Sequence, residues 1–286
     1  MTHTHRSLRK DKRAVSPAFS TVILTAAGIV MILVAMSYAN NILNLRVAEN
    51  EFTTNKQFML TAGQQIDDIA WTIGRTQTVT YSSRLGTVNF QRTALTYTFR
   101  VQTSSGWETL SLSSDTGILL YNVPVDSYKL GNNGYFQRVP NTADSSFLLA
   151  DSTASISQVL CEQKVPMPDG AYSRIALVPT MRVLTSTIQG TTYYKFYLPS
   201  LENGTSPYTS QSVTLTGGGI SKITRSGVNQ VELTVSFPKQ GLGFDSSFFN
   251  FAGTTITLNS ASTPKMNANS VVEFYVGTVI VQIGAA

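Results

Sequence analysis

The amino-acid sequence predicts an α+β protein in which a long N-terminal α-helix precedes a mainly antiparallel β-sandwich or jelly-roll-like head. Three observations support this fold class: an uncharged apolar stretch near the N-terminus, a heptad pattern that continues it, and short alternating runs of Thr, Ser, Val, Tyr and Phe afterwards. The expected organisation is a basic leader over 1–14, a helix over 15–75 and a head over 76–286, with 199–207 as the place where a two-lobed head would divide.

The apolar stretch runs from Arg13 to Arg46 with no charged residue between them. A helix needs about 20 such residues to cross a bilayer. Ser16 and Pro17 are typical of a helix start, because Ser caps free amides and Pro is tolerated in the first turn. We therefore expect a membrane-spanning helix that begins at this pair.

The net charge of +5 is concentrated ahead of the apolar stretch, where five basic residues lie within the first 14. Lys and Arg next to a span favour a cytoplasmic N-terminus and an exported C-terminal side. The rest of the chain is nearly neutral, which argues against a nucleic-acid partner. The charge pattern therefore indicates a cell-membrane protein with an extracellular head.

After the apolar stretch, hydrophobic residues recur at alternating spacings of three and four, the pattern of a helix that packs along one seam. The seam consists of Leu45, Ala48, Phe52, Met59, Ala62, Ile66, Ile69 and Ile73, and Asn55 interrupts it. Gly74 follows, where a left-handed helix cap is expected. The predicted rod from Pro17 to Ile73 is about 85 Å long. Its extra turns require a partner, either the head itself or neighbouring copies of the same helix.

The remainder of the chain has the period-two alternation of half-buried strands. The predicted strands are 95–101, 193–198, 231–237, 255–258 and 271–283, and the last is apolar on both faces near its end, as a central strand would be. Gly-rich segments such as 104–106 and 217–219 are typical of turns between strands.

Residue types for catalysis and metal binding are scarce. Both histidines, His3 and His5, lie in the leader, and Cys161 is the single cysteine. The body of the protein therefore has no Ser–His or Cys–His pair and no common zinc site, and the chain has no intramolecular disulfide. We expect no enzyme activity, no metal and no cofactor, and we expect Cys161 to be a small buried residue.

Two features point to the surface of the head. Asn203-Gly-Thr205 is an N-glycosylation sequon in a polar segment. The aromatic run from Tyr193 to Tyr197 is expected to place some rings outward, where they can contact a surface glycan or a protein ligand.

The segment Lys12-Arg13-Ala14-Val15-Ser16-Pro17, followed at once by the apolar helix, resembles the N-terminus of archaeal type IV pilin-like proteins. The resemblance covers roughly the first 40 residues. It implies a class III signal peptide that a prepilin-type peptidase cuts, with Arg13 and Ala14 ending the leader and Val15 starting the mature chain. It also implies self-association through the helix in an extracellular filament, with the head in surface contact or adhesion. Bacterial type IV pilins usually carry Glu at the fifth mature position, where this chain has Phe19.

Two other readings of the N-terminal region compete with the pilin-like one. In the first, the helix is not cut and holds a single-pass ectodomain permanently in the membrane as a surface binding module. In the second, the small-x-small sequence Ser37-Tyr38-Ala39 is an ordinary secretory cleavage site, and a soluble protein begins at Asn40.

Overall fold

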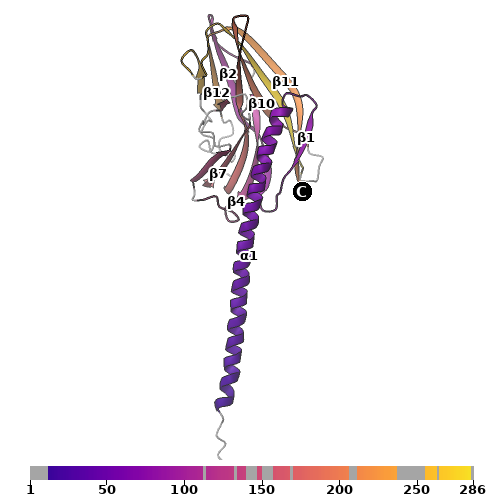
Figure 1. The fold of residues 1–286 in the computed structure, drawn as a ribbon, viewed down its shortest axis with the longest axis vertical. Helices are drawn as coiled ribbons and strands as arrows, with labels where there is room; N and C mark the ends of the chain where they lie inside the picture. Colours follow the sequence, from indigo (N-terminus) through magenta and orange to yellow (C-terminus); the bar gives the residue numbers. More distant parts are fainter. Residues whose placement is uncertain are drawn as a thin grey trace, which may run out of the picture. The chain divides into compact units, whose positions relative to one another are not determined.

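The computed structural model describes residues 12–111, 114–131, 134–139, 147–149, 157–167, 170–205, 211–236, 255–262 and 264–284, and for 12–18, 149 and 164–167 the backbone only. It confirms the predicted fold class: one long N-terminal helix precedes a mostly antiparallel β-rich domain (Figure 1). By internal contacts the chain divides into a unit over Met1–Val47 and a unit over Ala48–Ala286.

The helix α1 spans Lys12–Ile69, so both predicted ends were wrong by about one turn. It begins ahead of Pro17, which has no amide to donate to the carbonyl of Arg13 four residues earlier. It ends before Ile73 because the chain leaves the helix to enter the first strand. Gly74 has a φ of 79°, which confirms the expected left-handed conformation.

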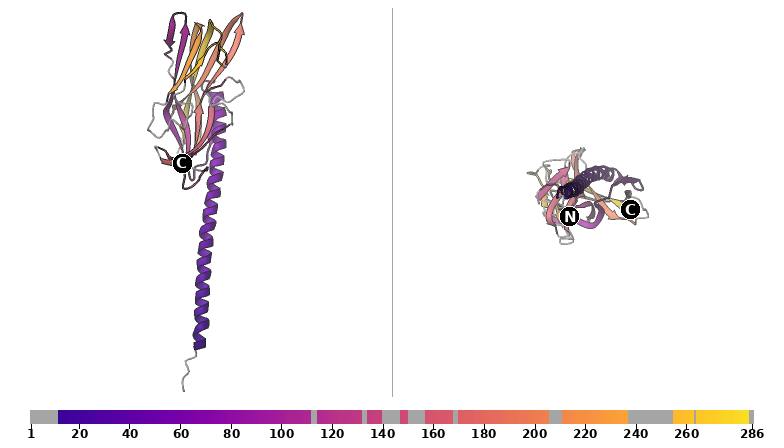
Figure 2. Two further views of the ribbon diagram at one scale, coloured as in Figure 1. Left: turned by 90° about the vertical axis from the view of Figure 1, so that its left-hand side faces the viewer. Right: turned by 90° about the horizontal axis from the view of Figure 1, so that it is seen from below.

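The strands of the described residues form two sheets, A and B (Figures 1 and 2). Sheet A contains, in spatial order, β1 (Thr76–Thr80), β11 (Ser212–Val228), β14 (Ser270–Ile283), β10 (Thr191–Asn203), β9 (Met181–Ile188) and β6 (Leu148–Leu149). Sheet B contains β13 (Thr255–Leu258), β12 (Gln230–Ser236), β2 (Thr87–Thr103), β4 (Ser114–Pro124), β8 (Gly170–Pro179), β7 (Ser157–Met167) and β5 (Gly134–Val139), with β3 (Gly106–Thr109) paired to β2.

Neighbouring strands in both sheets are antiparallel except β10 with β14 and β6 with β9. The five strands predicted from alternation are confirmed, and β14 is central in sheet A, between β11 and β10. The segment 104–106 is a turn, as predicted. The segment 217–219 is not a turn: it lies inside β11, at a register shift between Gly217 and Ile220.

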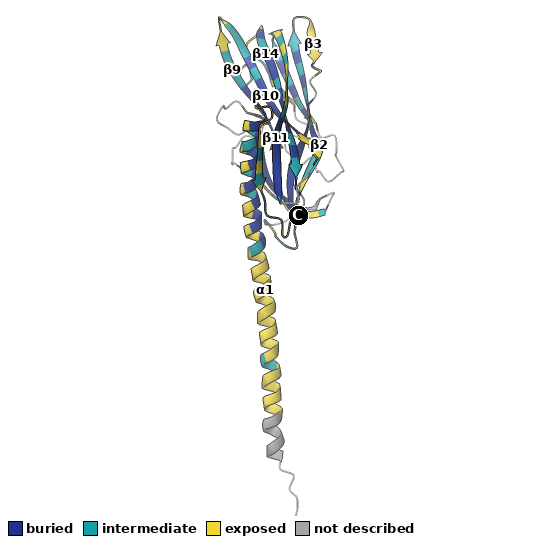
Figure 3. Ribbon diagram, turned by 90° about the vertical axis from the view of Figure 1, so that its right-hand side faces the viewer, coloured by how far each residue is buried: buried dark blue, intermediate teal, exposed yellow. Residues whose placement is uncertain are grey.

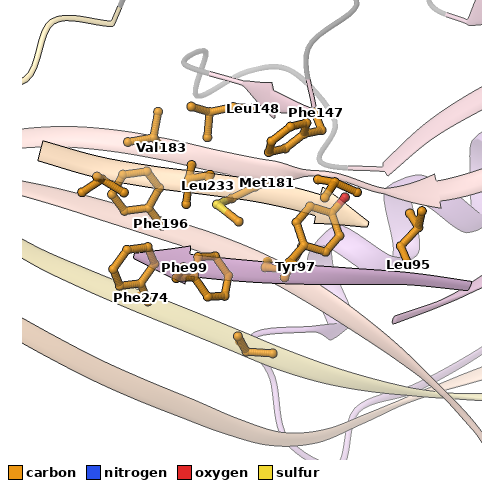
Figure 4. Packing of buried hydrophobic residues seen from close by; sticks show 14 of the residues in the cluster. Leu95, Tyr97, Phe99, Phe147, Leu148, Met181, Val183, Phe196, Leu233 and Phe274 are labelled. Atoms are coloured by element: carbon orange, nitrogen blue, oxygen red, sulfur yellow. The ribbon is translucent and has the colours of Figure 1, made fainter. Parts of the chain in front are cut away.

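The first hydrophobic core lies between the inner faces of sheets A and B. Phe274 of β14 is at its centre, with ring centroids 4.8 Å from Phe99 of β2 and 4.8 Å from Phe196 of β10 (Figure 4). Tyr97 of β2 is buried in the same layer, and its hydroxyl donates a 2.7 Å hydrogen bond to the carbonyl of Pro179. Each of these aromatic rings is buried, so these residues pack the interior of the head.

The second core lies between the last turns of α1 and the head. Strand β4 belongs to both cores, because Ile118 and Leu120 face the first and Leu119 and Tyr121 face the second. Burial on both faces explains why this strand reads as a nearly continuous apolar run. Strands β4, β7 and β8 of sheet B are therefore covered on one side by sheet A and on the other by the helix.

Candidate functional site: the N-terminal helix

The first part of α1 exposes a long series of apolar side chains. An 18-residue window of the helix is apolar enough to cross a membrane, and none of it is buried in the structure. The large apolar residues from Phe19 to Tyr38 are between 56% and 69% exposed. A contiguous apolar surface of this kind is typical of contact with lipid or with another protein chain.

The polar groups of this segment are compatible with a lipid environment. The hydroxyl of Thr25 donates to the carbonyl of Thr21, one turn earlier in the helix. Such a bond satisfies a Thr side chain without water. Gly28, in the middle of the segment, has open space where a side chain would be. By its length and composition the segment could span a membrane.

The second part of α1 packs on the head through the seam. Six of the seam residues are at most 4% exposed: Ala48, Phe52, Met59, Ala62, Ile66 and Ile69. Five of them, all except Ala48, belong to the second core, which also contains Leu119 and Tyr121 of β4 and Val279 of β14. Figure 3 shows the change from exposed to buried residues along α1. Leu45 and Ile73, at the two ends of the seam, are 53% and 70% exposed. Of the two partners considered for the extra turns, the head is the one that this structure contains.

Asn55, the polar residue that interrupts the seam, is fully buried. Its Nδ2 donates to the carbonyl of Ser82 at 2.6 Å and to the carbonyl of Glu51 at 3.0 Å. A buried amide that bonds a loop carbonyl fixes how the helix is rotated against the head, because an apolar residue cannot replace that bond.

Glu51 makes the most extensive polar contact of the docked helix, although it is not among the residues predicted from the sequence to have a role. Its buried carboxylate accepts hydrogen bonds from the backbone amides of Arg84 (2.9 Å), Leu85 (3.0 Å) and Gly86 (3.2 Å), in the segment between β1 and β2. It also accepts a 2.7 Å bond from the hydroxyl of Tyr121. Burial, and then the bond to this carboxylate, raise the pKa of Tyr121. Successive amides that converge on one acid form a strong anion-binding turn.

The end of α1 lies directly on sheet A. A Cβ at Gly217 of β11 would clash with the carbonyl oxygen of Thr72, and a Cβ at Gly277 of β14 with that of Ala70. Both positions therefore require glycine for close approach rather than for an unusual backbone angle. This contact explains why Gly217 belongs to a strand although its composition is typical of a turn.

Three further contacts join the residues that follow the helix to the same sheet. The amide of Gly74 donates to the carbonyl of Gly217 at 2.8 Å, and the amide of Gly217 donates to the carbonyl of Arg75 at 2.8 Å. Trp71 meets the ring of Tyr197 edge-on, with centroids 5.2 Å apart. The residues between the helix and β1 are thus hydrogen-bonded to β11, the neighbour of β1 in sheet A.

The predicted processing residues Arg13, Ala14 and Val15 lie in the first turn of α1, and their side chains lie outside the described residues. His3 and His5 also lie outside them. Asn203 is exposed at the end of β10, and its Nδ2 donates to the carbonyl of Gly204. The sequon is therefore accessible, and its modification stays a prediction.

The described part of the head has no cluster of three or more His, Cys, Asp or Glu side chains suited to a metal ion. Cys161 of β7 is buried, as expected, and burial raises its pKa to about 11. A thiol of that pKa is protonated at neutral pH and is a poor nucleophile. Comparison of the chain with protein-family models, with curated proteins and with solved structures finds no match.

Proposed function

We propose that this protein is a pilin-like subunit of an extracellular type IV filament. The first part of α1 anchors the subunit in the membrane and later assembles with copies of itself, and the β head makes surface contacts. The observation that carries the proposal is the division of one helix into two chemically different parts. The large apolar residues from Phe19 to Tyr38 are exposed, whereas the seam residues from Ala48 to Ile69 are buried against the head.

This division suits a subunit that must change its surroundings without unfolding. A helix stored in lipid and then moved into a filament core exchanges lipid contacts for contacts with neighbouring helices, and both environments favour apolar side chains. The head must follow the helix through that transfer. The contacts of Glu51, Asn55 and the glycine positions supply a firm attachment at the helix end.

The N-terminal segment supports processing before assembly. Five basic residues ahead of the span hold the leader at the anionic cytoplasmic face. The segment Lys12 to Pro17 resembles the site that a prepilin-type peptidase cuts, which makes the peptidase and the membrane the first two partners of this chain. Removal of the leader leaves a subunit without a charged block at the end of its helix.

The competing readings differ in where the mature chain begins. A permanently anchored surface binding module keeps the leader. A soluble secreted protein begins at Asn40, after removal of everything up to Ala39.

Determination of the N-terminus of the native protein separates the three readings. The proposal expects Val15 as the first residue. An N-terminus at Met1 or Thr2 would support the permanent anchor, and one at Asn40 the secreted protein. A matched variant, Ala14→Asp, should retain the leader while it still enters the membrane fraction. Normal processing of that variant would refute the assignment of the cleavage site.

A further inference from the structure

The outer face of sheet B, on the side of β3, carries an exposed tryptophan in a flat polar surface. Along β2 and β12 the outward residues alternate with Phe99, Val101, Val231 and Leu233, which are buried in the first core. The strand registers place the outward residues in two adjacent rows: Trp107, Gln102 and Gln230 in one, and Thr109, Arg100 and Glu232 in the other. We name these six residues the tryptophan face.

Trp107 is 40% exposed and lies on the short strand β3, whose four residues are all exposed (Figure 3). The guanidinium of Arg100 is 5.2 Å from the centroid of its ring. Arg100 is itself held by Glu232 through a 2.7 Å ion pair. The ring is therefore oriented by a cation on one side, while much of its surface remains in contact with water.

The aromatic run that was expected to place some rings outward has two half-buried rings, Tyr193 and Tyr197, and neither is as exposed as Trp107. Tyr194 and Phe196 are buried in the first core. Tyr197 stacks on Tyr275 with centroids 4.9 Å apart, and the ammonium of Lys222 lies 5.1 Å from the centroid of Tyr275. Because Trp71 also meets Tyr197, the rings in this group serve each other and the helix end rather than a ligand.

Charge balance on the tryptophan face indicates an uncharged ligand. Arg100 and Glu232 neutralise each other. At the next position of β3, Glu108 pairs with Arg225 of β11 across the two sheets, at 2.7 Å. Among the described residues of this face, no excess of either sign remains to attract a polyanion or a polycation. A protein partner would also be expected to meet a larger apolar centre than one ring.

We propose that the tryptophan face binds a neutral polysaccharide built of hexopyranose units. A pyranose ring presents an apolar C–H face, which packs on an indole, and a rim of hydroxyl groups. Gln102 lies directly opposite Trp107 on β2, Gln230 is in the same row one strand further on, and Thr109 is two residues along β3. These three side chains supply neutral donors and acceptors beside the ring. This proposal gives a ligand class to the surface contact in the proposed function and rests on that part of it alone.

The ion pair between Glu108 and Arg225 positions β3 for this role. Both the Nε and Nη2 atoms of Arg225 donate to the carboxylate of Glu108, at 3.2 and 2.7 Å. The hydrogen bond from Arg225 lowers the pKa of the Glu108 carboxyl. This two-bond geometry ties a four-residue strand of sheet B to the end of sheet A and limits its movement.

The test is affinity electrophoresis of the full-length protein in a non-ionic detergent whose headgroup carries no sugar. Native gels contain dextran, mannan or amylose, with alginate as the acidic polymer. We expect retardation by at least one neutral polymer and about a tenfold loss of affinity in Trp107→Ala, as expected for loss of one aromatic packing contact. Trp107→Phe should keep part of the binding.

Phe136→Ala is the matched control, because Phe136 is 42% exposed on β5 of the same sheet and also lies beside an arginine, Arg138. It should bind like the unmodified protein. The proposal is overturned by absence of retardation in all three neutral polymers, by equal loss in both alanine variants, or by preference for alginate. Polysaccharide binding in these gels does not require leader cleavage or filament formation. A negative result would therefore refute the polysaccharide proposal and leave the pilin-like proposal to its own test.

Discussion

The hydroxyl of Tyr121, on a central strand of sheet B, donates a 2.7 Å hydrogen bond to the carboxylate of Glu51, on the helix. Both side chains are buried, at 0% and 5% exposure. The bond therefore joins the helix to the strand that separates the two cores. It lies within the compact unit of residues 48–286, less than one helical turn from the first residue of that unit.

Glu51→Ala should lower the free energy of unfolding of the head by about 3 kcal/mol, because it leaves the Tyr121 hydroxyl and three loop amides without their acceptor. Chemical denaturation of the detergent-solubilised protein measures this value. Glu49→Ala, at an exposed position on the same turn, is the control and should change it by less than about 0.5 kcal/mol. Equal effects of the two substitutions would contradict the role given to Glu51.

Gly217→Ala should destabilise the head by about 1–3 kcal/mol, because its Cβ meets the Thr72 carbonyl, which belongs to the backbone and cannot turn away. Gly219→Ala is a matched control two residues along the same strand, where nothing lies within 4 Å of an added Cβ. It should be neutral. Thermal unfolding of both variants checks the pair, and tolerance of alanine at Gly217 would argue against the close approach.

Ile66→Asp should unfold the docked helix from the head or prevent folding, with a cost of about 4 kcal/mol or more, because it buries an unpaired charge. Ile73→Asp belongs to the same predicted seam but is 70% exposed, so it should retain the stability of the unmodified protein. Limited proteolysis between α1 and β1 reports the release of the helix. Equal protease sensitivity of the two variants would show that the seam is not the contact.

Cys161 should resist alkylation in the folded protein and react readily once denatured, because burial raises its pKa to about 11. Above its ordinary pKa of 9.0 the thiol ionises in the unfolded chain first. The contribution of the Cys161 thiol to the free energy of unfolding is therefore fully present below pH 9. It falls by about 2–3 kcal/mol as the pH rises to about 11. The difference in unfolding free energy between unmodified protein and Cys161→Ala, followed across this range, isolates that loss. A pH-independent difference would contradict it.

The periodicity of the chain predicted the helix, its seam and the strands, because burial imposes a spacing that can be read residue by residue. The spacing could not distinguish the head from a second helix as the partner, since both bury the same apolar stripe. The burial of Phe52 and Ile66 in one core with residues of β4, and the ring contact between Phe52 and Tyr121, decide this for the docked turns. The exposed part of the helix shows no such partner within the described residues.

Residues whose roles depend on distant backbone groups were not predictable in this way. Glu51 looks like any solvated acid on a helix, because the amides of the segment 84–86 carry no side-chain signature. Gly217 looks like a turn residue, because the carbonyl that excludes a side chain lies on another element. Trp107 is one of two tryptophans in the sequence, and only the strand register separates its exposed ring from that of Trp71.

The central claim, that the exposed part of α1 is stored in the membrane and then assembles outside the cell, is tested most directly by shearing intact cells and analysing the extracellular fraction by mass spectrometry. The account predicts filaments that contain this chain with its head intact and with Val15 as the first residue. Recovery of the protein in the membrane fraction alone, with residues 1–14 still attached, would contradict it.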